Sequence, residues 1–260
     1  MKKNILLILF SAIFVNMNAQ KNNICGKIEY TYTTNLESVI QEKYELYFNR
    51  NFSYSIETDV KKAENEKSKE QRKPMGKQVD IVVGRKNTTS KFYYNSINSF
   101  YFRDNFFDEV LLVKEEKLKN SWKLHSETKK LSNFLCKKAT IRFRGRNYIA
   151  WYTEEIPVPY GPWKLRNLPG IILEFYDTDK VFHVVANKIK VGDDNCSFKF
   201  DKKELEKAIS IDAYLNKKEE LIDNMFAGMS ARRPKGSSPF KRDKNCDDCT
   251  KEIEIFNNEN

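Results

Sequence analysis

The stretch of residues 150–175, AWYTEEIPVPYGPWKLRNLPGIILEF, decides most of what the sequence indicates about the fold. It starts with an apolar, strand-like run, continues through a segment rich in proline and glycine, and ends in a second apolar run. Proline fixes φ, removes a backbone donor and pushes the preceding residue into extended geometry. We therefore expect residues 156–170 to form a stiff, extended loop between two strands.

Trp163 lies in the middle of this loop and allows two interpretations. Its large apolar ring and single N–H suit a plug that covers one end of a sheet. Alternatively, the loop and its aromatic side chains line a ligand or partner site, with Arg166 as the nearest cation to an anionic ligand. The candidate binding residues are then Trp151, Tyr160, Trp163, Arg166, Leu168, Pro169 and Gly170.

Two segments of the stretch carry a family resemblance. GPWKLRNLPGIILEF at 161–175 resembles the signature of the GLPGLI family, small exported proteins of the Bacteroidetes, and CKKATIRFRGRNYIAWYTEEIP at 136–157 resembles the block before it. The sequence departs from the signature at Asn167, where the family usually has glycine, and at Ile171, where it usually has leucine. The resemblance implies export and a single domain, and the family has no established activity to carry over.

The N-terminus has the pattern of a secretory signal peptide. Lys2 and Lys3 precede an apolar run at 5–15, and Ala19 provides a small residue at a cleavage position. The run is too short to span a bilayer comfortably, although an uncleaved anchor is the alternative. We expect residues 1–19 to be removed and residues 20–260 to form one exported domain, periplasmic or extracellular, without a transmembrane segment.

The charge balance is basic, with 46 Lys and Arg against 36 Asp and Glu and a formal net charge of +10. Such a surface could favour lipid head groups or anionic glycans, but interspersed Lys and Glu favour an ordinary solvated surface. Nucleic acid is excluded as a partner by the predicted export and by the lack of a recognition motif or a dense basic helix.

Five cysteines are compatible with disulfides in an exported protein, and their odd number leaves at least one thiol free or paired between chains. A single C-x-x-C without a second pair or a nearby histidine is a weak zinc signal, so a local or tail-to-body disulfide is favoured over a metal site. The disulfide candidates are Cys25, Cys136, Cys196, Cys246 and Cys249.

Most of the remaining sequence alternates between apolar and polar residues, which is typical of half-buried strands. A charged insertion at about 60–78 and a polar, cysteine-bearing tail from about 231 interrupt this pattern. Ser210 is a suitable N-cap for an amphipathic helix over 211–229, and residues 252–256 predict a last edge strand. The fold class is mainly β with a C-terminal helix: a curved antiparallel sheet or partly open β-barrel, with the helix on its concave or open side.

No complete catalytic motif occurs: G-x-S-x-G, H-E-x-x-H and Walker A patterns are all absent. His125 is interpreted as a surface tip or a strand position packed by its ring, and His183 as a satisfied strand histidine. No catalytic residue, cofactor or metal site is predicted. This favours a non-catalytic binding or carrier protein of the cell envelope with an apolar or peptide ligand. The alternatives are an interaction partner of an outer-membrane assembly or transporter, and a hydrolase that uses Glu154, Glu155 and Glu174.

Overall fold

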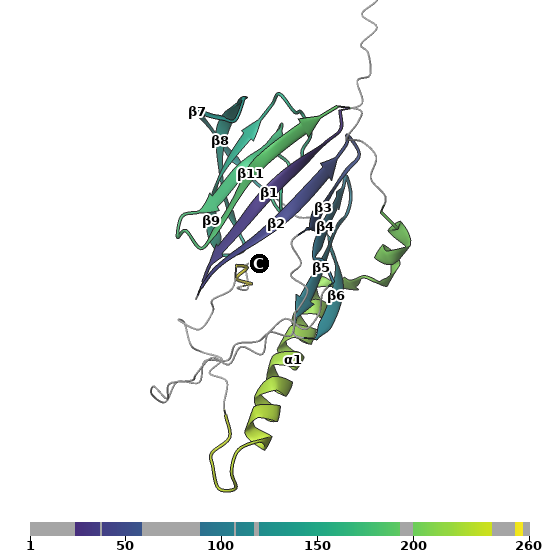
Figure 1. The fold of residues 1–260 in the computed structure, drawn as a ribbon, viewed down its shortest axis with the longest axis vertical. Helices are drawn as coiled ribbons and strands as arrows, with labels where there is room; N and C mark the ends of the chain where they lie inside the picture. Colours follow the sequence, from purple (N-terminus) through teal and green to yellow (C-terminus); the bar gives the residue numbers. More distant parts are fainter. Residues whose placement is uncertain are drawn as a thin grey trace, which may run out of the picture.

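One large open sheet forms the body of the protein (Figure 1), as a computed structural model shows for residues 24–36, 38–58, 89–106, 108–116, 120–192, 200–240 and 253–256. Its twelve strands lie in the order β12-β6-β5-β4-β3-β2-β1-β11-β10-β9-β8-β7. The strands are β1 (Gly26–Asn35), β2 (Val39–Phe48), β3 (Phe52–Glu57), β4 (Phe92–Ser96), β5 (Phe100–Phe106), β6 (Glu109–Glu115), β7 (Lys123–Leu131), β8 (Phe134–Phe143), β9 (Arg146–Thr153), β10 (Ile171–Asp177), β11 (Phe182–Val191) and β12 (Ile209–Ser210).

The pairing is antiparallel everywhere except between β12 and β6, which run parallel. The two ends of the sheet, β12 and β7, do not pair, so the sheet curves without closing into a barrel. The predicted mainly β fold with a C-terminal helix is therefore confirmed as a curved open sheet. The predicted hairpin around residues 177–180 is also present, because Tyr176 on β10 pairs with His183 on β11.

The main core lies on the inner face of the sheet. On β1, Ile28, Tyr30 and Tyr32 are buried while the residues between them are half-buried, as the period of two requires. The proline-rich loop covers this face and contributes six residues to the same apolar cluster: Ile156, Val158, Tyr160, Trp163, Leu165 and Leu168. The loop is thus an integral part of the core, as the plug interpretation expects.

The C-terminal helix, α1 (Ile211–Ala231), follows a short 3-10 turn at Lys202–Lys207. The Ser210 hydroxyl accepts a hydrogen bond from the Ala213 amide at 3.2 Å, which confirms the predicted N-cap. The helix packs against β6 and β12 at one edge of the sheet and then extends away from it (Figure 1). The expected contact with the concave or open side is therefore found only for the first turns, where the buried Tyr214 packs against Phe102, and the rest of the helix does not cover the sheet.

Residues 253–256 do not form the expected edge strand. One backbone hydrogen bond, from the Ile255 amide to the Arg144 carbonyl at 3.1 Å, holds them to the turn between β8 and β9. Figure 1 shows this segment in yellow, beside the chain end and within the curve of the sheet. The predicted signal peptide and charged insertion, and most of the tail, lie outside the described residues.

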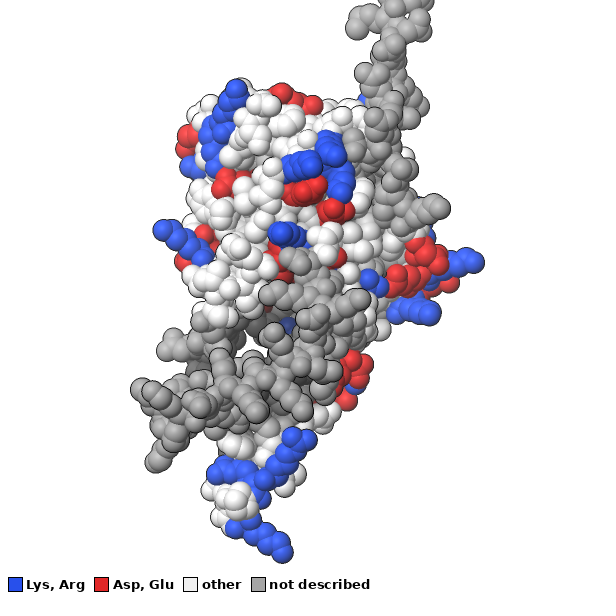
Figure 2. Space-filling model, in the orientation of Figure 1, with Lys and Arg blue, Asp and Glu red and all other residues white. Residues whose placement is uncertain are grey.

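The described surface carries both signs of charge, interspersed over the sheet on the face in Figure 2, with Lys and Arg gathered near the end of α1. This mixture fits the ordinary solvated surface that the sequence favours. None of the helices in the described part of the chain is long and apolar enough to cross a membrane.

Candidate functional site

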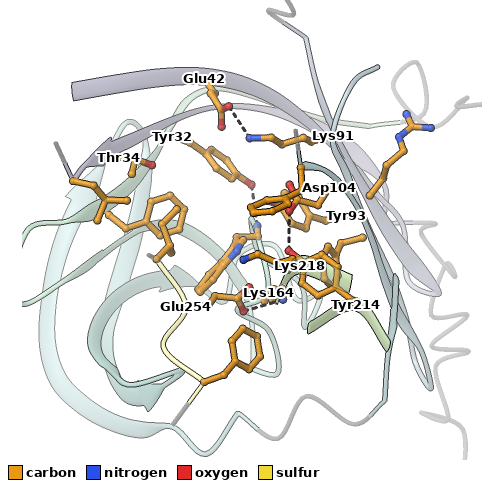
Figure 3. Close-up of a pocket in the computed structure, with 18 residues that line it drawn as sticks. Tyr32, Thr34, Glu42, Lys91, Tyr93, Asp104, Lys164, Tyr214, Lys218 and Glu254 are labelled. Carbon is orange, nitrogen blue, oxygen red and sulfur yellow. Dashed lines mark hydrogen bonds and ion pairs between the residues drawn. The ribbon is translucent and has the colours of Figure 1, made fainter. Parts of the chain in front are cut away.

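A pocket of about 290 Å³ opens on the inner face of the sheet (Figure 3). Its walls come from distant parts of the chain: β1, β2, the β4–β5 hairpin, the proline-rich loop, β11, α1 and residues 253–256. Its volume is near the lower end for small-molecule sites. It combines aromatic walls with carboxylates and cations, so its lining offers both flat apolar faces and hydrogen-bonding groups.

Aromatic rings form much of the wall. Tyr32 stacks on Tyr44 with ring centroids 4.1 Å apart, and Tyr93 lies beside both. The Tyr32 hydroxyl accepts a hydrogen bond from the Trp163 amide at 2.8 Å, which ties the loop to β1. Burial raises the pKa of Tyr93 well above its ordinary value, so this ring stays a neutral phenol.

Three carboxylates line the pocket from different sides (Figure 3). Glu42 on β2 pairs with Lys91 at 2.9 Å. Asp104 on β5 accepts hydrogen bonds from the Tyr214 hydroxyl at 2.8 Å and from the Asn105 amide at 2.9 Å. Glu254 pairs with Lys164 at 2.8 Å. Each carboxylate is therefore held in place by a donor from another part of the site or from its own strand.

Beneath Glu254 lies a buried ionic cluster. The side chains of Lys164 and Glu115 are 1% and 2% exposed, and the Lys164 ammonium lies 3.0 Å from Glu115 Oε2 and 4.0 Å from the centre of the Phe102 ring. Arg144 completes the cluster by pairing with Glu115 and by lying 3.7 Å from Glu254 Oε1. Buried charges require such partners, because an unpaired ion in a protein interior costs several kcal/mol.

Glu254 has the unusual titration behaviour that catalytic carboxyls often show. Burial raises the pKa of Glu254, and the negative charge of Glu115 adds to that effect against the opposing ammonium of Lys164. A glutamate with a raised pKa keeps its proton at a higher pH than usual and can donate it to a leaving group. Among the three pocket carboxylates, Glu254 is therefore the best candidate for a general acid.

The structure brings one of the seven predicted binding residues to this pocket, namely Trp163. Its ring is 4% exposed and packs against Phe143, Tyr148, Phe175 and Phe182, so its contacts are mostly those of a plug. The other six are not among the residues that line the pocket: Trp151, Tyr160, Arg166, Leu168, Pro169 and Gly170. A binding role for these residues stays a prediction.

Arg166 is buried in a neutral setting. Its guanidinium donates to Asn167 Oδ1, Asn95 Oδ1 and the Ser96 carbonyl at 3.0–3.3 Å, so its contacts tie the loop to the β4–β5 hairpin. Asn167, the departure from the family signature, has a φ of 69°, the left-handed region that glycine usually occupies. Asparagine tolerates this conformation, so the turn forms without the glycine.

The carboxylates of the hydrolase hypothesis lie elsewhere. Glu154 pairs with Lys137 at 2.7 Å, Glu155 accepts from the Leu135 amide, and Glu174 bonds His183 at 2.9 Å and also Lys129. Cys136 is a free, buried thiol, which rules it out as half of a disulfide, whereas Cys25 is buried and disulfide-bonded. The other disulfide candidates, Cys196, Cys246 and Cys249, lie outside the described residues, so the pairing stays a prediction.

Sequence reasoning missed most of the pocket, including Glu42, Asp104 and Glu254. These three carboxylates are far apart in the chain, and none belongs to a short motif. The alternation that predicted a strand at 252–256 did mark Glu254 as facing away from Ile253 and Ile255, but it gave no sign of what Glu254 would meet. Lys164 had a clearer signal, because it follows Trp163 directly in the stiff loop.

Comparison with known proteins identifies the family. A family model described as the N-terminal domain of N-glycanase peptide matches residues 86–215, which is half of the chain. The chain belongs to this family. The match includes the stretch at 136–175 on which the GLPGLI resemblance was based.

The chain also resembles several solved structures, at low sequence identity. One PNGF-II structure is 16% identical with a TM-score of 0.49 and covers 75% of this chain and 32% of that chain; a second is 18% identical with a TM-score of 0.44 and covers 71% and 30%. An uncharacterized conserved protein from Thermus thermophilus is 9% identical, with a TM-score of 0.35 and coverage of 74% and 92%. The chain thus spans about a third of the PNGF-II chains, and no curated protein matches it.

Membership of an N-glycanase family overturns two expectations. A non-catalytic binding or carrier protein, or an interaction accessory, was the wrong functional class, and the expectation that the chain is not an enzyme was wrong with it. The absence of short catalytic motifs does not exclude an enzyme. Carboxylates that act together in hydrolysis need only meet in space, and they can come from different strands and loops without leaving a local pattern.

Proposed function

We propose that the protein is a glycan-processing hydrolase of the N-glycanase type, which acts on N-linked glycoproteins in the pocket described above. The observation that carries the proposal is Glu254, a carboxyl with a raised pKa at the wall of an aromatic-lined pocket, in a chain that belongs to an N-glycanase domain family. The chain spans only about a third of the PNGF-II chain. We therefore propose that the domain described here has hydrolase activity on its own.

The aromatic walls suit a sugar. The faces of a sugar ring carry C–H groups with partial positive charge, and the face of an aromatic ring is negative. Tyr93 and Tyr32 are placed to pack against such a face, while Glu42, Lys91 and Asp104 can hydrogen-bond hydroxyl and amide groups. A site of this mixed kind binds an amphipathic ring better than a purely apolar molecule.

Hydrolysis of an N-linked glycan at the asparagine amide needs two proton transfers. Water adds to the side-chain amide carbon, the bond from that carbon to nitrogen breaks, and the sugar leaves as an amine, so that asparagine becomes aspartate. We assign the donation of a proton to the leaving nitrogen to Glu254, because its pKa is raised. We assign the activation of water to Asp104, which the Tyr214 hydroxyl orients from α1.

A glycopeptide assay tests the proposal. The full chain is incubated with a peptide that carries one N-linked glycan, and mass spectrometry follows the loss of the glycan. We expect release by the wild type, a large loss of release in Glu254→Gln, and no change in Glu154→Gln, whose exposed carboxylate pairs with Lys137 away from the pocket. A folded wild type that releases no glycan from any of several glycopeptides would contradict the proposal.

Two finer assignments accompany this function. The signal-peptide pattern supports an exported protein in the periplasm or outside the cell, where glycoproteins of other cells are accessible. The resemblance to the GLPGLI signature supports an origin among exported Bacteroidetes proteins. Detection of the mature chain, beginning near Gln20, in the culture medium or periplasmic fraction would test the export.

A further inference from the structure

The pocket carboxylate Glu254 reaches the site on a segment of its own. Residues 253–256, here called the C-terminal segment, form neither a strand nor a helix, yet Ile253, Glu254 and Phe256 all line the pocket. In Figure 3, Glu254 lies beside Lys164 on the opposite side of the pocket from Glu42 and Lys91. One wall of the pocket is therefore made by a segment with no regular backbone pairing.

The turn between β8 and β9 holds this segment at three points. The Ile255 amide donates to the Arg144 carbonyl at 3.1 Å, and Arg146 Nε donates to the Ile253 carbonyl at 3.0 Å. The Arg144 guanidinium lies 4.3 Å from the centre of the Phe256 ring. These contacts involve Ile253, Ile255 and Phe256, so together they fix both the backbone of the segment and its position along the turn.

Gly145, at the tip of the turn, makes this close approach possible. It has a φ of 74°, in the left-handed region, and a Cβ atom at this position would lie 2.7 Å from Ile255 Cβ. Any side chain at position 145 therefore pushes against the C-terminal segment. The need for glycine here has two separable causes, the backbone conformation of the turn and the space that Ile255 occupies.

Arg144 links the position of the segment to the chemistry of the pocket. The same guanidinium that packs on Phe256 lies 3.7 Å from Glu254 Oε1 and pairs with the buried Glu115. Lys164 then bridges Glu254 and Glu115. When the segment is docked, Glu254 is held at the buried cluster. When it is not docked, the pocket lacks both this carboxylate and one wall.

We propose that the pocket is a composite site that docking of the C-terminal segment completes, with the turn Arg144–Gly145–Arg146 as its positioning element. Docking places Glu254 against Lys164 and adds Phe256 to the lining of the pocket, and release of the segment leaves the site incomplete. The docking itself stands on the contacts above, and only the catalytic use of Glu254 rests on the proposed function.

Hydrogen exchange of the full chain tests the docking directly. In Gly145→Asn, asparagine tolerates the left-handed backbone but adds a Cβ that meets Ile255, so we expect the Ile255 amide to lose its protection. Adding Ile255→Gly removes the opposing Cβ, so the remaining contacts, at Ile253 and Phe256, should seat the segment again. Gly228→Ala, where a Cβ has open space around it, is the matched control and should leave the exchange at Ile255 unchanged.

The glycopeptide assay on the same variants tests the link to function. We expect hydrolysis to fall in Gly145→Asn, to recover in the double variant, and to keep its wild-type rate in Gly228→Ala. Phe256→Ala, which leaves the turn intact, should weaken protection and hydrolysis together, and melting temperatures confirm that each variant is folded.

Unchanged exchange at Ile255 in Gly145→Asn would overturn the inference, as would lost protection with undiminished hydrolysis. A wild type without hydrolysis whose exchange follows the predicted pattern contradicts the proposed function and supports the docking.

Discussion

At the scale of single residues, Glu254 illustrates how burial and pairing compete. Its side chain is 16% exposed, and two cations lie within reach, yet the cost of burying its charge dominates and raises its pKa. Lys164 and Arg144 keep the carboxyl in place, while Glu115 opposes its ionisation. The result is a carboxyl that is oriented as in an ion pair but retains its proton more easily than an exposed glutamate does.

The raised pKa of Glu254 predicts the pH dependence of hydrolysis. If Glu254 donates a proton, activity requires its protonated form, so the rate should fall as the pH rises through the raised pKa of Glu254. The Glu254→Gln variant cannot donate this proton, and its residual rate should lack that alkaline limb. Rates measured across a series of buffers with one glycopeptide test this, and a limb that persists unchanged in Glu254→Gln would assign it to another group.

Trp163 gives a second prediction, about stability. Its ring is buried among four aromatic side chains, so Trp163→Ala should lower the free energy of unfolding by about 3–5 kcal/mol. Trp151→Ala is the matched control. Trp151 is only partly buried, so this substitution should lower the free energy of unfolding by less. Urea denaturation of both variants compares the two values. Equal losses would show that Trp163 does not act as the plug of the loop.

Cys136 gives a third prediction. Burial raises the pKa of this thiol to about 11, so almost none of it is thiolate at neutral pH. We expect iodoacetamide to leave Cys136 unmodified in the folded protein and to modify it fully after unfolding, as peptide mapping would show. Rapid labelling of Cys136 under native conditions would contradict its buried position.

At the scale of elements, the proline-rich loop depends on close backbone contact with β9. A Cβ atom on Gly170 would overlap the Thr153 carbonyl, so Gly170→Ala should destabilise the protein by about 1–3 kcal/mol or more. Gly228→Ala should have the opposite sign and stabilise by about 0.5–1 kcal/mol, because Gly228 is in α1 with open space around it. Thermal denaturation measures both, and the same sign for both would contradict the packing described here.

Several elements could be predicted from the sequence because their signals are local. Alternation identified β1, β2 and the β10–β11 hairpin, the prolines identified the loop, and Ser210 identified the start of α1. Local sequence patterns gave wrong predictions where the structure of a segment depends on residues far away in the chain. Residues 253–256 alternate as a strand would, but alternation does not provide a pairing edge, and the segment docks instead through Arg144 and Arg146.

At the scale of the whole molecule, the pocket exists only because the curved sheet brings distant segments together. Glu42, Asp104 and Glu254 lie on β2, β5 and the C-terminal segment, so no spacing in the sequence could have associated them. Trp163 was the one predicted residue that reached the pocket, because the prolines around it mark the stiff loop in the sequence. The rest of the site depends on sheet order and curvature, which a single sequence does not determine.

The contacts of Glu174 on the outer face of the sheet predict how the free energy of unfolding changes at acidic pH. Glu174 on β10 bonds His183 on β11 and Lys129 on β7, and these partners hold the pKa of Glu174 below its ordinary value despite the opposing effect of burial. The stability from these contacts is present above the unfolded-state pKa of glutamate and is lost as the pH falls through the lower folded-state value. Glu174→Gln should therefore flatten the loss of stability in acid, and an unchanged pH dependence would contradict this assignment.

The measurement that tests the account most directly is the position of an oxygen-18 label after hydrolysis in labelled water. N-glycanase action in the pocket breaks the bond between the asparagine amide carbon and its nitrogen. We predict that the former asparagine becomes aspartate carrying one oxygen-18 atom, with the glycan released intact. A peptide that keeps its asparagine, with or without a sugar residue attached, would contradict the account, because the reaction would then be glycosidic cleavage or absent.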